Sequence, residues 1–443
     1  MNDPIYFDRV PEILVEIVGE LKAELNSINQ LFAIRDLFGR ARFLVDVRPD
    51  RSSDLERSLE RLAVLATKRL GPRAYPPAQA LLYRSELGED LELPEGLLLW
   101  DGPPELRLID RQITGRAWSR VSDPSESGAT AVPRLAFFSL KGGVGRSTAA
   151  AVAAWDFAMK GRRVLVVDLD LEAPGLTAGL LPQDHRPTFG IVDWFVEDAV
   201  GQGETILRDL VASAPLARDF PGDIRVASSH GRNPGDYLAK LGRCYLDLPK
   251  PGNTTPEPWE RRLVRLVNTL EQQENPDVMI LDVRAGLPDL ASVAVTDLGA
   301  DVLLFAIDSD QTWTGYRLLF DQWKRSGAVY RLRERLTLVA ALVPETERQS
   351  YLVGLRERAW DLFRETLYDE VEPATEVSFA EEPFSFDLDD PEAPHSPVPV
   401  YWNRGLATLG NLHALDETLV NAAFPRFLER VRLLAGGREE AAP

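Results

Sequence analysis

The hydrophobic positions of this chain follow one pattern before about residue 120 and a different one after about residue 134. In the first part, apolar residues recur every three or four positions over 13–25 and 55–70, which predicts two amphipathic helices. Short apolar runs that are typical of strands stand at 42–47, 97–100 and 106–109. Residues 1–120 are therefore expected to form a small α+β domain.

From residue 134 onward, apolar runs of strand length alternate with helical repeats. This alternation predicts an α/β fold, in which a mainly parallel sheet carries helices on both faces. The expected strands are 135–140, 163–168, 224–228, 277–282, 301–307 and 336–343. The expected helices are 147–159, 259–273, 288–296, 312–325 and 350–365, with two more after Asn403. We expect a linker at 121–133, the larger domain at 134–435, an irregular acidic segment at 381–399 and a disordered tail at 436–443.

Composition narrows the classes of protein that fit this pattern. The hydrophobic content of 44% is ordinary for a folded globular protein, and no apolar run has the length of a bilayer crossing. The N-terminus lacks the basic start and apolar core of a signal peptide, so we expect a cytoplasmic protein. The single cysteine, Cys244, excludes an internal disulfide and a cysteine-based metal site within one chain.

The net charge of −19 disfavours direct DNA binding, because attraction to phosphates needs a basic face. A local basic patch is the alternative, and its candidates are Arg261, Arg262, Arg265, Lys324, Arg325, Arg331, Arg333 and Arg335. Such charged helix faces are usually only solvated. We also expect 424–434 to form a packed terminal helix and not a membrane anchor.

The segment Arg134–Thr148 reads as a buried strand that runs into a glycine-rich loop and then into a helix. Its glycines allow backbone angles that turn amide groups toward an anion, and Ser147 begins an alanine-rich helix. Free N–H groups and the helix dipole then converge on one point, which predicts a phosphate site. The generic phosphate loop has glycine at the position of Leu140 and lysine at that of Arg146, and this chain has neither.

The run Lys141-Gly-Gly-Val-Gly resembles the deviant Walker A loop of the ParA/MinD-type ATPases, which are P-loop proteins of the SIMIBI class. The resemblance implies that Lys141 has a catalytic role and reaches across a dimer to the partner's nucleotide. The residues that it implies for ATP binding are Gly142, Gly143, Val144, Gly145, Arg146, Ser147 and Thr148. Arg146 also departs from the family, which has a catalytic lysine there, and arginine is bulkier and planar. Three alternatives follow for the loop: it binds nucleotide with altered turnover, it binds nucleotide with normal activity, or it binds no nucleotide.

Two further motifs place carboxylates after predicted strands. The apolar run that begins at Arg163 ends in Asp168 and Asp170, and the run that begins at Pro276 ends in Asp282. By resemblance, Asp170 orients the attacking water and Asp168 lies near the magnesium shell. The resemblance also implies that Asp282 holds Mg²⁺ together with Ser147.

The residues after Asp282 match the family only in part. Gly286 stands where the family has its switch II glycine, a nucleotide-binding position. Arg284 is an addition. It either reaches the γ-phosphate or a partner subunit, or forms a salt bridge with Asp289.

The resemblance covers roughly residues 134–435 and implies an ATPase switch that binds ATP and Mg²⁺ and forms a homodimer when ATP binds. We expect the N-terminal domain to recognise a protein partner, by analogy alone in a bacterial conflict or signalling system. One alternative is a nucleotide-binding scaffold or sensor with little hydrolysis because of Arg146. Another is a DNA-partition ATPase, which the charge disfavours. Adenine is the expected base, since the strand at 336–343 is not followed by the Asn-Lys-x-Asp run that reads guanine.

Overall fold

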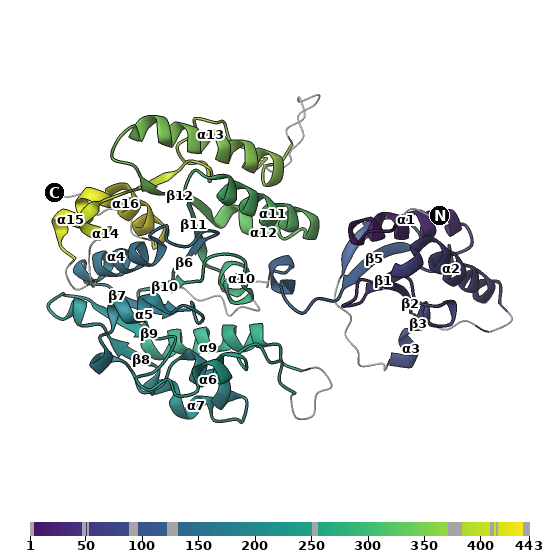
Figure 1. Cartoon of the computed structure of the whole chain (residues 1–443), viewed down its shortest axis with the longest axis horizontal. Coiled ribbons are helices and arrows are strands. Elements are labelled where there is room, and N and C mark those ends of the chain that lie inside the picture. The colour runs from purple at the N-terminus through teal and green to yellow at the C-terminus, as the bar shows by residue number, and fades with distance from the viewer. Residues whose placement is uncertain are drawn as a thin grey trace. The chain divides into compact units, whose positions relative to one another are not determined.

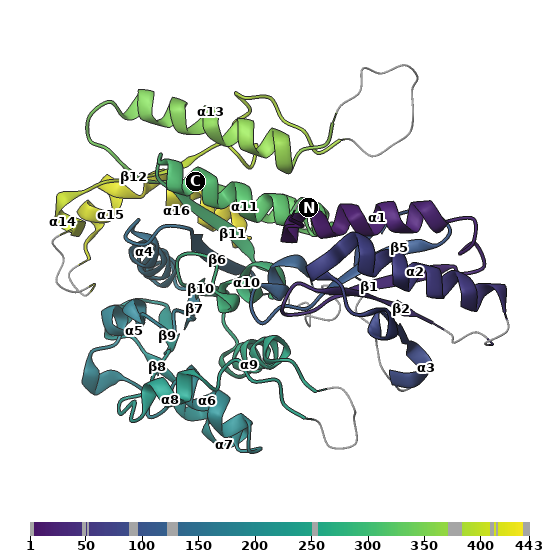
Figure 2. The same cartoon turned by 45° about the vertical axis from the view of Figure 1, so that its right-hand side comes forward.

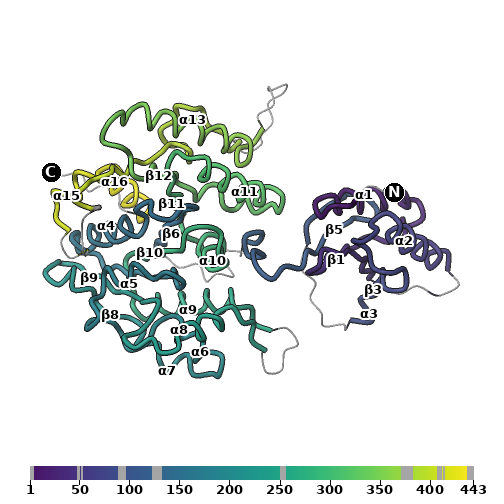
Figure 3. The backbone as a smooth tube through the Cα atoms, viewed as in Figure 1, coloured from purple at the N-terminus to yellow at the C-terminus, as the bar shows by residue number. Residues whose placement is uncertain are grey.

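The computed structural model describes residues 4–46, 50, 53–87, 96–121, 132–249, 256–370, 383–407, 412 and 415–436. Residues 122–131 of the expected linker and 437–443 of the expected tail lie outside this set. The chain folds into two compact units, and Figures 1 and 3 follow it through both. The first unit consists of Met1–Arg116 with Pro249–Pro256, and the second of Ala117–Leu248 with Glu257–Pro443.

The first unit is an α+β fold. Its elements are α1 (Val10–Leu21), β1 (Gln30–Arg35), β2 (Ala41–Val45), α2 (Asp54–Leu70), β3 (Leu81–Tyr83), α3 (Arg84–Leu87), β4 (Leu97–Trp100) and β5 (Glu105–Asp110). Within the described residues the sheet has the order β3-β2-β1-β5-β4. The strand β1 pairs antiparallel with β2 and parallel with β5, so the sheet is mixed.

Hydrophobic spacing predicted the helices of this unit better than its strands. The apolar residues of α1 and α2 are buried in one hydrophobic core with residues of the sheet, as their helical spacing predicted. The strands β2, β4 and β5 stand where apolar runs predicted them. The strands β1 and β3 were not predicted. The strand β1 begins with the polar residue Gln30 and ends with the polar residue Arg35, and β3 has only three residues.

The second unit is the larger α/β fold. Its strands are β6 (Arg134–Ser139), β7 (Arg163–Asp168), β8 (Val211–Ser213), β9 (Asp223–Ala227), β10 (Val278–Asp282), β11 (Asp301–Ala306), β12 (Leu336–Val343) and β13 (Val398–Tyr401). Its helices before β10 are α4 (Arg146–Met159), α5 (Gly175–Leu180), α6 (Ile191–Asp198), α7 (Gly203–Ile206), α8 (Tyr237–Leu241) and α9 (Trp259–Glu274). Those after β10 are α10 (Asp289–Thr296), α11 (Asp310–Ser326), α12 (Val329–Leu332), α13 (Arg348–Thr366), α14 (Arg404–Ala407), α15 (Glu417–Ala423) and α16 (Pro425–Leu434).

The sheet of this unit has the order β13-β12-β11-β6-β10-β7-β9-β8 across the described residues. Neighbouring strands run parallel, except that β8 pairs antiparallel with β9. The predicted parallel sheet with helices on both faces is therefore confirmed. Figure 2 shows these helices around the strands from a second direction.

Side chains of β6 alternate between two hydrophobic cores. Leu135 and Phe137 pack with α4 and α16 on one face of the sheet. Ala136 and Phe138 pack with α9, α10 and α11 on the other. Because both faces are covered, the strand is buried along its whole length, which explains its continuous apolar run.

The C-terminal part of the chain completes the sheet and one of its cores. The strand β13 begins at Val398, inside the segment that was expected to be irregular, and pairs with β12. The helix α16 lies beside α4 (Figure 3) and buries Phe427 against Phe137 and Phe305. Its apolar face therefore packs inside the unit, as predicted for 424–434.

Candidate functional site

Three polar residues end adjacent strands in the middle of the second sheet. Ser139 ends β6, Asp282 ends β10 and Asp168 ends β7, with β10 between the other two. Asp282 pairs with Asp168 in register. Since all three strands run parallel, these side chains meet at one edge of the sheet, where open α/β folds bind their ligands.

The loop between β6 and α4 presents main-chain N–H groups at this edge. The N–H groups of Gly142, Gly143 and Val144 donate no hydrogen bond to any described residue. Gly143 and Gly145 have φ of 74° and 79°, a backbone conformation that favours glycine. A Cβ on Gly142 or Gly143 would meet no atom within 4 Å, so the loop borders open space. Free amides at the N-terminus of a helix have the geometry that favours binding of an anion.

Leu140 stands where the generic phosphate loop has glycine, and its contact with α11 gives the reason. A Cβ added to Gly315 of α11 would lie 2.7 Å from Leu140 Cδ1. The leucine therefore packs against a helix that leaves room for it. This contact joins the start of the loop to the hydrophobic core.

Arg146, the first residue of α4, points into the site and not toward solvent. Its side chain is only 8% exposed. Nε donates to Asp282 Oδ1 at 2.8 Å, Nη1 donates to Ser139 Oγ at 3.3 Å, and Nη2 donates to Asp170 Oδ2 at 3.4 Å. One guanidinium group thus holds the carboxylates of two separate motifs together.

Asp168 is the most deeply buried carboxylate of the site. Thr177 donates to its Oδ2 from both N and Oγ1, at 2.8 and 2.6 Å, and Asp170 N donates to Oδ1 at 3.2 Å. Burial, with the nearby Asp282 carboxylate adding to it, raises the pKa of Asp168 to about 7. Asp168 therefore organises the chain from β7 to α5 through its own hydrogen bonds.

The other two carboxylates face Arg146. Burial raises the pKa of Asp282 and of Asp170, and the positive charge of Arg146 opposes both shifts. Asp282 Oδ2 is buried and has no hydrogen-bond partner among the described residues. Arg146 contacts the carboxylates of both Asp170 and Asp282, and a carboxylate oxygen without a hydrogen bond is a ligand that Mg²⁺ prefers. These residues fit a Mg²⁺ ion.

Lys141 lies in the same loop but takes no part in this cluster. Its side chain is half-buried and forms no hydrogen bond or ion pair with the residues that the structure describes. The charge of Lys141 is thus available to a group outside the chain.

Two residues after β10 have partners of their own. The N–H of Gly286 donates to Ser139 O at 2.9 Å, which ties the segment after β10 to the end of β6. Arg284 Nη1 lies 3.5 Å from Glu172 Oε2, and this ion pair links the segment after β10 to the segment after Asp170. The two segments that follow the carboxylate motifs therefore contact each other directly.

Residues 135–312 match the family described as the CobQ/CobB/MinD/ParA nucleotide binding domain. Within the second unit, residues 135–312 are thus similar to a nucleotide-binding domain of this family. The glycine-rich loop, both carboxylate motifs and Arg284 all fall within the matched residues. No curated protein sequence matches the chain.

Solved structures that resemble the chain do so at low identity. A plasmid partition protein from Borrelia burgdorferi is 17% identical, with a TM-score of 0.35 over 51% of this chain and 86% of that one. A variant of Cyanothece McdA in complex with ATP is 14% identical, with a TM-score of 0.41 over 71% and 100%. Cobyrinic acid a,c-diamide synthase from Mycobacterium smegmatis, with bound ATP analogue and magnesium, is 20% identical, with a TM-score of 0.37 over 52% and 83%.

The second unit brings most of the predicted site residues together and adds two that were not predicted. Arg146, Asp170 and Asp282 are in contact, and Asp168 joins them through the N–H of Asp170. The additions are Ser139, whose hydroxyl accepts a hydrogen bond from Arg146, and Thr177, whose hydroxyl donates one to Asp168. No motif contains Thr177, since it follows Asp168 by nine residues and meets it only in the fold.

The candidate basic patch consists in part of buried or paired arginines. Arg262 is fully buried and donates to Asp198, and Arg265 donates to the same carboxylate. Arg333 forms an ion pair with Asp369. These arginines stabilise the fold and do not form an open basic face. In the part of the chain that the structure describes, no helix is long and apolar enough to cross a bilayer.

Proposed function

We propose that this protein is an ATP-binding switch that hydrolyses ATP and couples its nucleotide state to a partner protein. The observation that carries the proposal is the loop at 142–144, whose N–H groups donate no hydrogen bond to any described residue and whose glycines border open space. This loop leads into α4, the helix whose first residue, Arg146, contacts the buried Asp282. Amides at a helix N-terminus bind the phosphates, and the neighbouring carboxylates supply the remaining chemistry.

Each residue of the cluster then has a role toward ATP. Ser147 and Asp282 would hold Mg²⁺, which supplies positive charge beside the β- and γ-phosphates. We favour Asp282 over Asp168 for this contact, since both oxygens of Asp168 already accept hydrogen bonds. Asp170 orients the attacking water. Arg146 has to release at least one carboxylate before it turns toward the phosphates, so phosphate binding and carboxylate release are coupled.

ATP is expected to bind roughly tenfold or more tightly than GTP, and to bind roughly tenfold more weakly when Mg²⁺ is chelated. The reasons are the missing guanine motif and the Mg²⁺ contacts of Ser147 and Asp282. Titration calorimetry with both nucleotides, with and without EDTA, measures the affinities. Ser147→Ala is the control, because it should lose most of the Mg²⁺ effect. Equal affinity for ATP and GTP, or no binding of either, would contradict the proposal.

ATP is expected to convert the protein from monomer to dimer, and Lys141→Ala is expected to prevent this. Lys141 has no partner in its own chain among the described residues, and its charge can neutralise phosphates bound to a second copy. Light scattering of both proteins with ATP measures the mass. Lys160→Ala, which removes an exposed lysine at the end of α4, is the matched control. A Lys141→Ala variant that still forms the dimer refutes this role.

The first unit is the part that we propose for partner recognition, since the catalytic groups all lie in the second. A second candidate function is a nucleotide-binding scaffold or sensor with little turnover. The three hydrogen bonds of Arg146 favour it, because a guanidinium group held between carboxylates resists the movement that catalysis needs. Steady-state hydrolysis by the wild-type protein separates the two functions.

A further inference from the structure

A segment outside the predicted motifs holds the residues that follow Asp170. We call Arg232–Leu248 the strap, which follows the loop after β9 and includes α8. Tyr237 Oη donates to Leu171 O at 2.6 Å. Tyr245 Oη donates to Glu172 Oε1, also at 2.6 Å. Leu171 and Glu172, which directly follow Asp170, are thus each held by a tyrosine of the strap.

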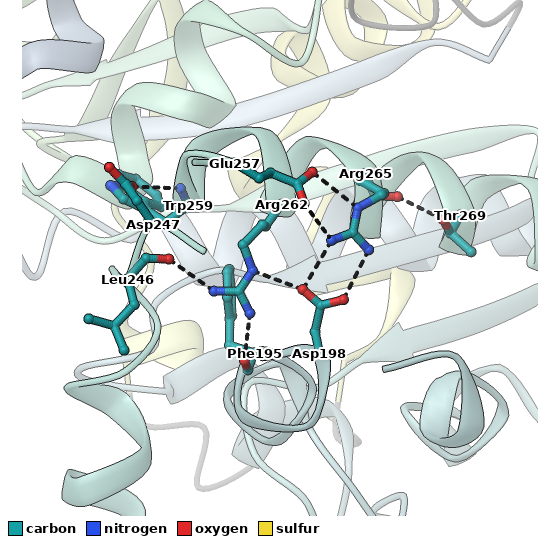
Figure 4. A network of polar contacts seen from close by, with 9 residues as sticks. All are labelled: Phe195, Asp198, Leu246, Asp247, Glu257, Trp259, Arg262, Arg265 and Thr269. Carbon is teal, nitrogen blue, oxygen red and sulfur yellow. Dashed lines mark hydrogen bonds and ion pairs between the residues drawn. The ribbon is translucent and has the colours of Figure 1, made fainter. Parts of the chain in front are cut away.

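The end of the strap is fixed by a buried network on α9 (Figure 4). The fully buried Arg262 donates from Nη1 to Leu246 O at 3.1 Å and from Nη2 to Phe195 O at 2.6 Å. Trp259 N donates to Asp247 Oδ1 at 3.1 Å. The ring of Tyr245 packs edge-on against Trp259, at 5.3 Å between centroids. A buried arginine with several partners is costly to move, so this end of the strap is rigid.

The middle of the strap is attached to α6. Lys240 Nζ lies 2.6 Å from Asp193 Oδ1, and Asp193 Oδ2 accepts the N–H of Gly190 at 2.8 Å. Cys244 is buried nearby, and burial raises its pKa to about 12, so it serves as an apolar contact. The tyrosines therefore project from a segment that is fixed at both its middle and its end.

We infer that Tyr237 and Tyr245 are positioning residues that hold the Asp170 segment in the geometry required for hydrolysis. Asp170 directly precedes the two residues that they bind. Its hydrogen bond with Arg146 is already long, at 3.4 Å, so a small shift of the segment breaks it. Glu172 extends the effect, because it also pairs with Arg284 after β10. The role in hydrolysis rests on the proposed function, whereas the positioning itself does not.

Hydrogen–deuterium exchange on the nucleotide-free full chain tests the positioning. Tyr245→Phe and Tyr237→Phe are each expected to speed exchange of peptides within 169–177 by roughly fivefold, the effect of losing one hydrogen bond. Peptides of β6 and β10 should stay unchanged. Tyr351→Phe is the matched control, because it also removes a tyrosine hydroxyl that bonds to the main chain, at Asp308 N. Unchanged exchange at 169–177, or faster exchange throughout the sheet, overturns the inference.

Variants of Glu172 test the same contact from the other side, including the case in which a tyrosine variant does not fold. Glu172→Ala should speed exchange at 169–177 as Tyr245→Phe does. Glu172→Gln keeps an acceptor oxygen for Tyr245 and should exchange more slowly than Glu172→Ala. Equal exchange in Glu172→Ala and the wild type overturns the inference.

Hydrolysis provides the second readout. Tyr245→Phe is expected to lower kcat about fivefold while the Kd for ATP stays within about twofold, because only the position of Asp170 changes. An equal loss in kcat and in ATP affinity would overturn the role in hydrolysis. A wild-type protein without hydrolysis would refute the proposed function and leave the exchange result standing.

Discussion

Asp170→Ala is expected to lower ATP hydrolysis by about a hundredfold or more, with the Kd for ATP changed by less than about threefold. Asp170 lies in the site through its contact with Arg146, and its other oxygen accepts the N–H of Ala173. Removing the carboxylate removes the group that orients water but leaves the amides of the loop in place. Phosphate release under single-turnover conditions and titration calorimetry measure the two quantities.

Asp170→Asn is the matched control for this experiment. The amide keeps the size of the side chain and an oxygen for Ala173, but it loses the charge that water activation needs. We expect both variants to be inactive and both to bind ATP. Loss of ATP binding in either variant would mean that Asp170 supports the structure of the site, and its role toward water would be wrong.

The strands that carry the site could be predicted because they are buried on both faces. The strands β6, β7 and β10 are continuous apolar runs that end abruptly in polar residues, and this pattern located their ends to within one residue. The loop between β6 and α4 was predictable for a different reason. Glycines that recur just before a helix indicate backbone angles that other residues rarely adopt. The carboxyl ends of the strands and the loop together located the site.

Side-chain partners could not be predicted in the same way. The sequence suggested a γ-phosphate contact, a partner subunit or Asp289 for Arg284, and the structure gives Glu172 as its ion pair. Arg146 contacts Asp282, which lies 136 residues away, and a long side chain has many such partners within reach. Spacing along the chain says nothing about which of them it meets.

The strap shows the same limit for a whole segment. Its residues 232–248 include only a five-residue helix, so neither periodicity nor a motif marks it. Its importance comes from two hydroxyl groups that reach Leu171 and Glu172 across the fold. A tyrosine in a loop is ordinary in sequence, and only its hydrogen-bond partner distinguishes it.

Arg146→Lys is expected to raise the hydrolysis rate about tenfold, which corresponds to about 1.4 kcal/mol of transition-state stabilisation. Arginine is held by Asp282, Ser139 and Asp170 at fixed angles, and these bonds have to break as the group follows the transferred phosphate. Lysine keeps the positive charge between the carboxylates as a compact group that moves more freely. Steady-state phosphate release measures the change.

Arg134→Lys separates this effect from a general loss of buried hydrogen bonds. Arg134 is as buried as Arg146 and donates to Glu271, Asn268 and the main chain of Leu298, but it begins β6 at the opposite end of the strand. Both variants should lower the melting temperature, since both lose hydrogen bonds of a buried guanidinium group. Only Arg146→Lys should raise the rate. A lower rate in Arg146→Lys than in the wild type would mean that Asp282, Asp170 and Ser139 are arranged for arginine, and that Arg146 itself stabilises the transition state. The three hydrogen bonds of Arg146 would then no longer favour the scaffold function.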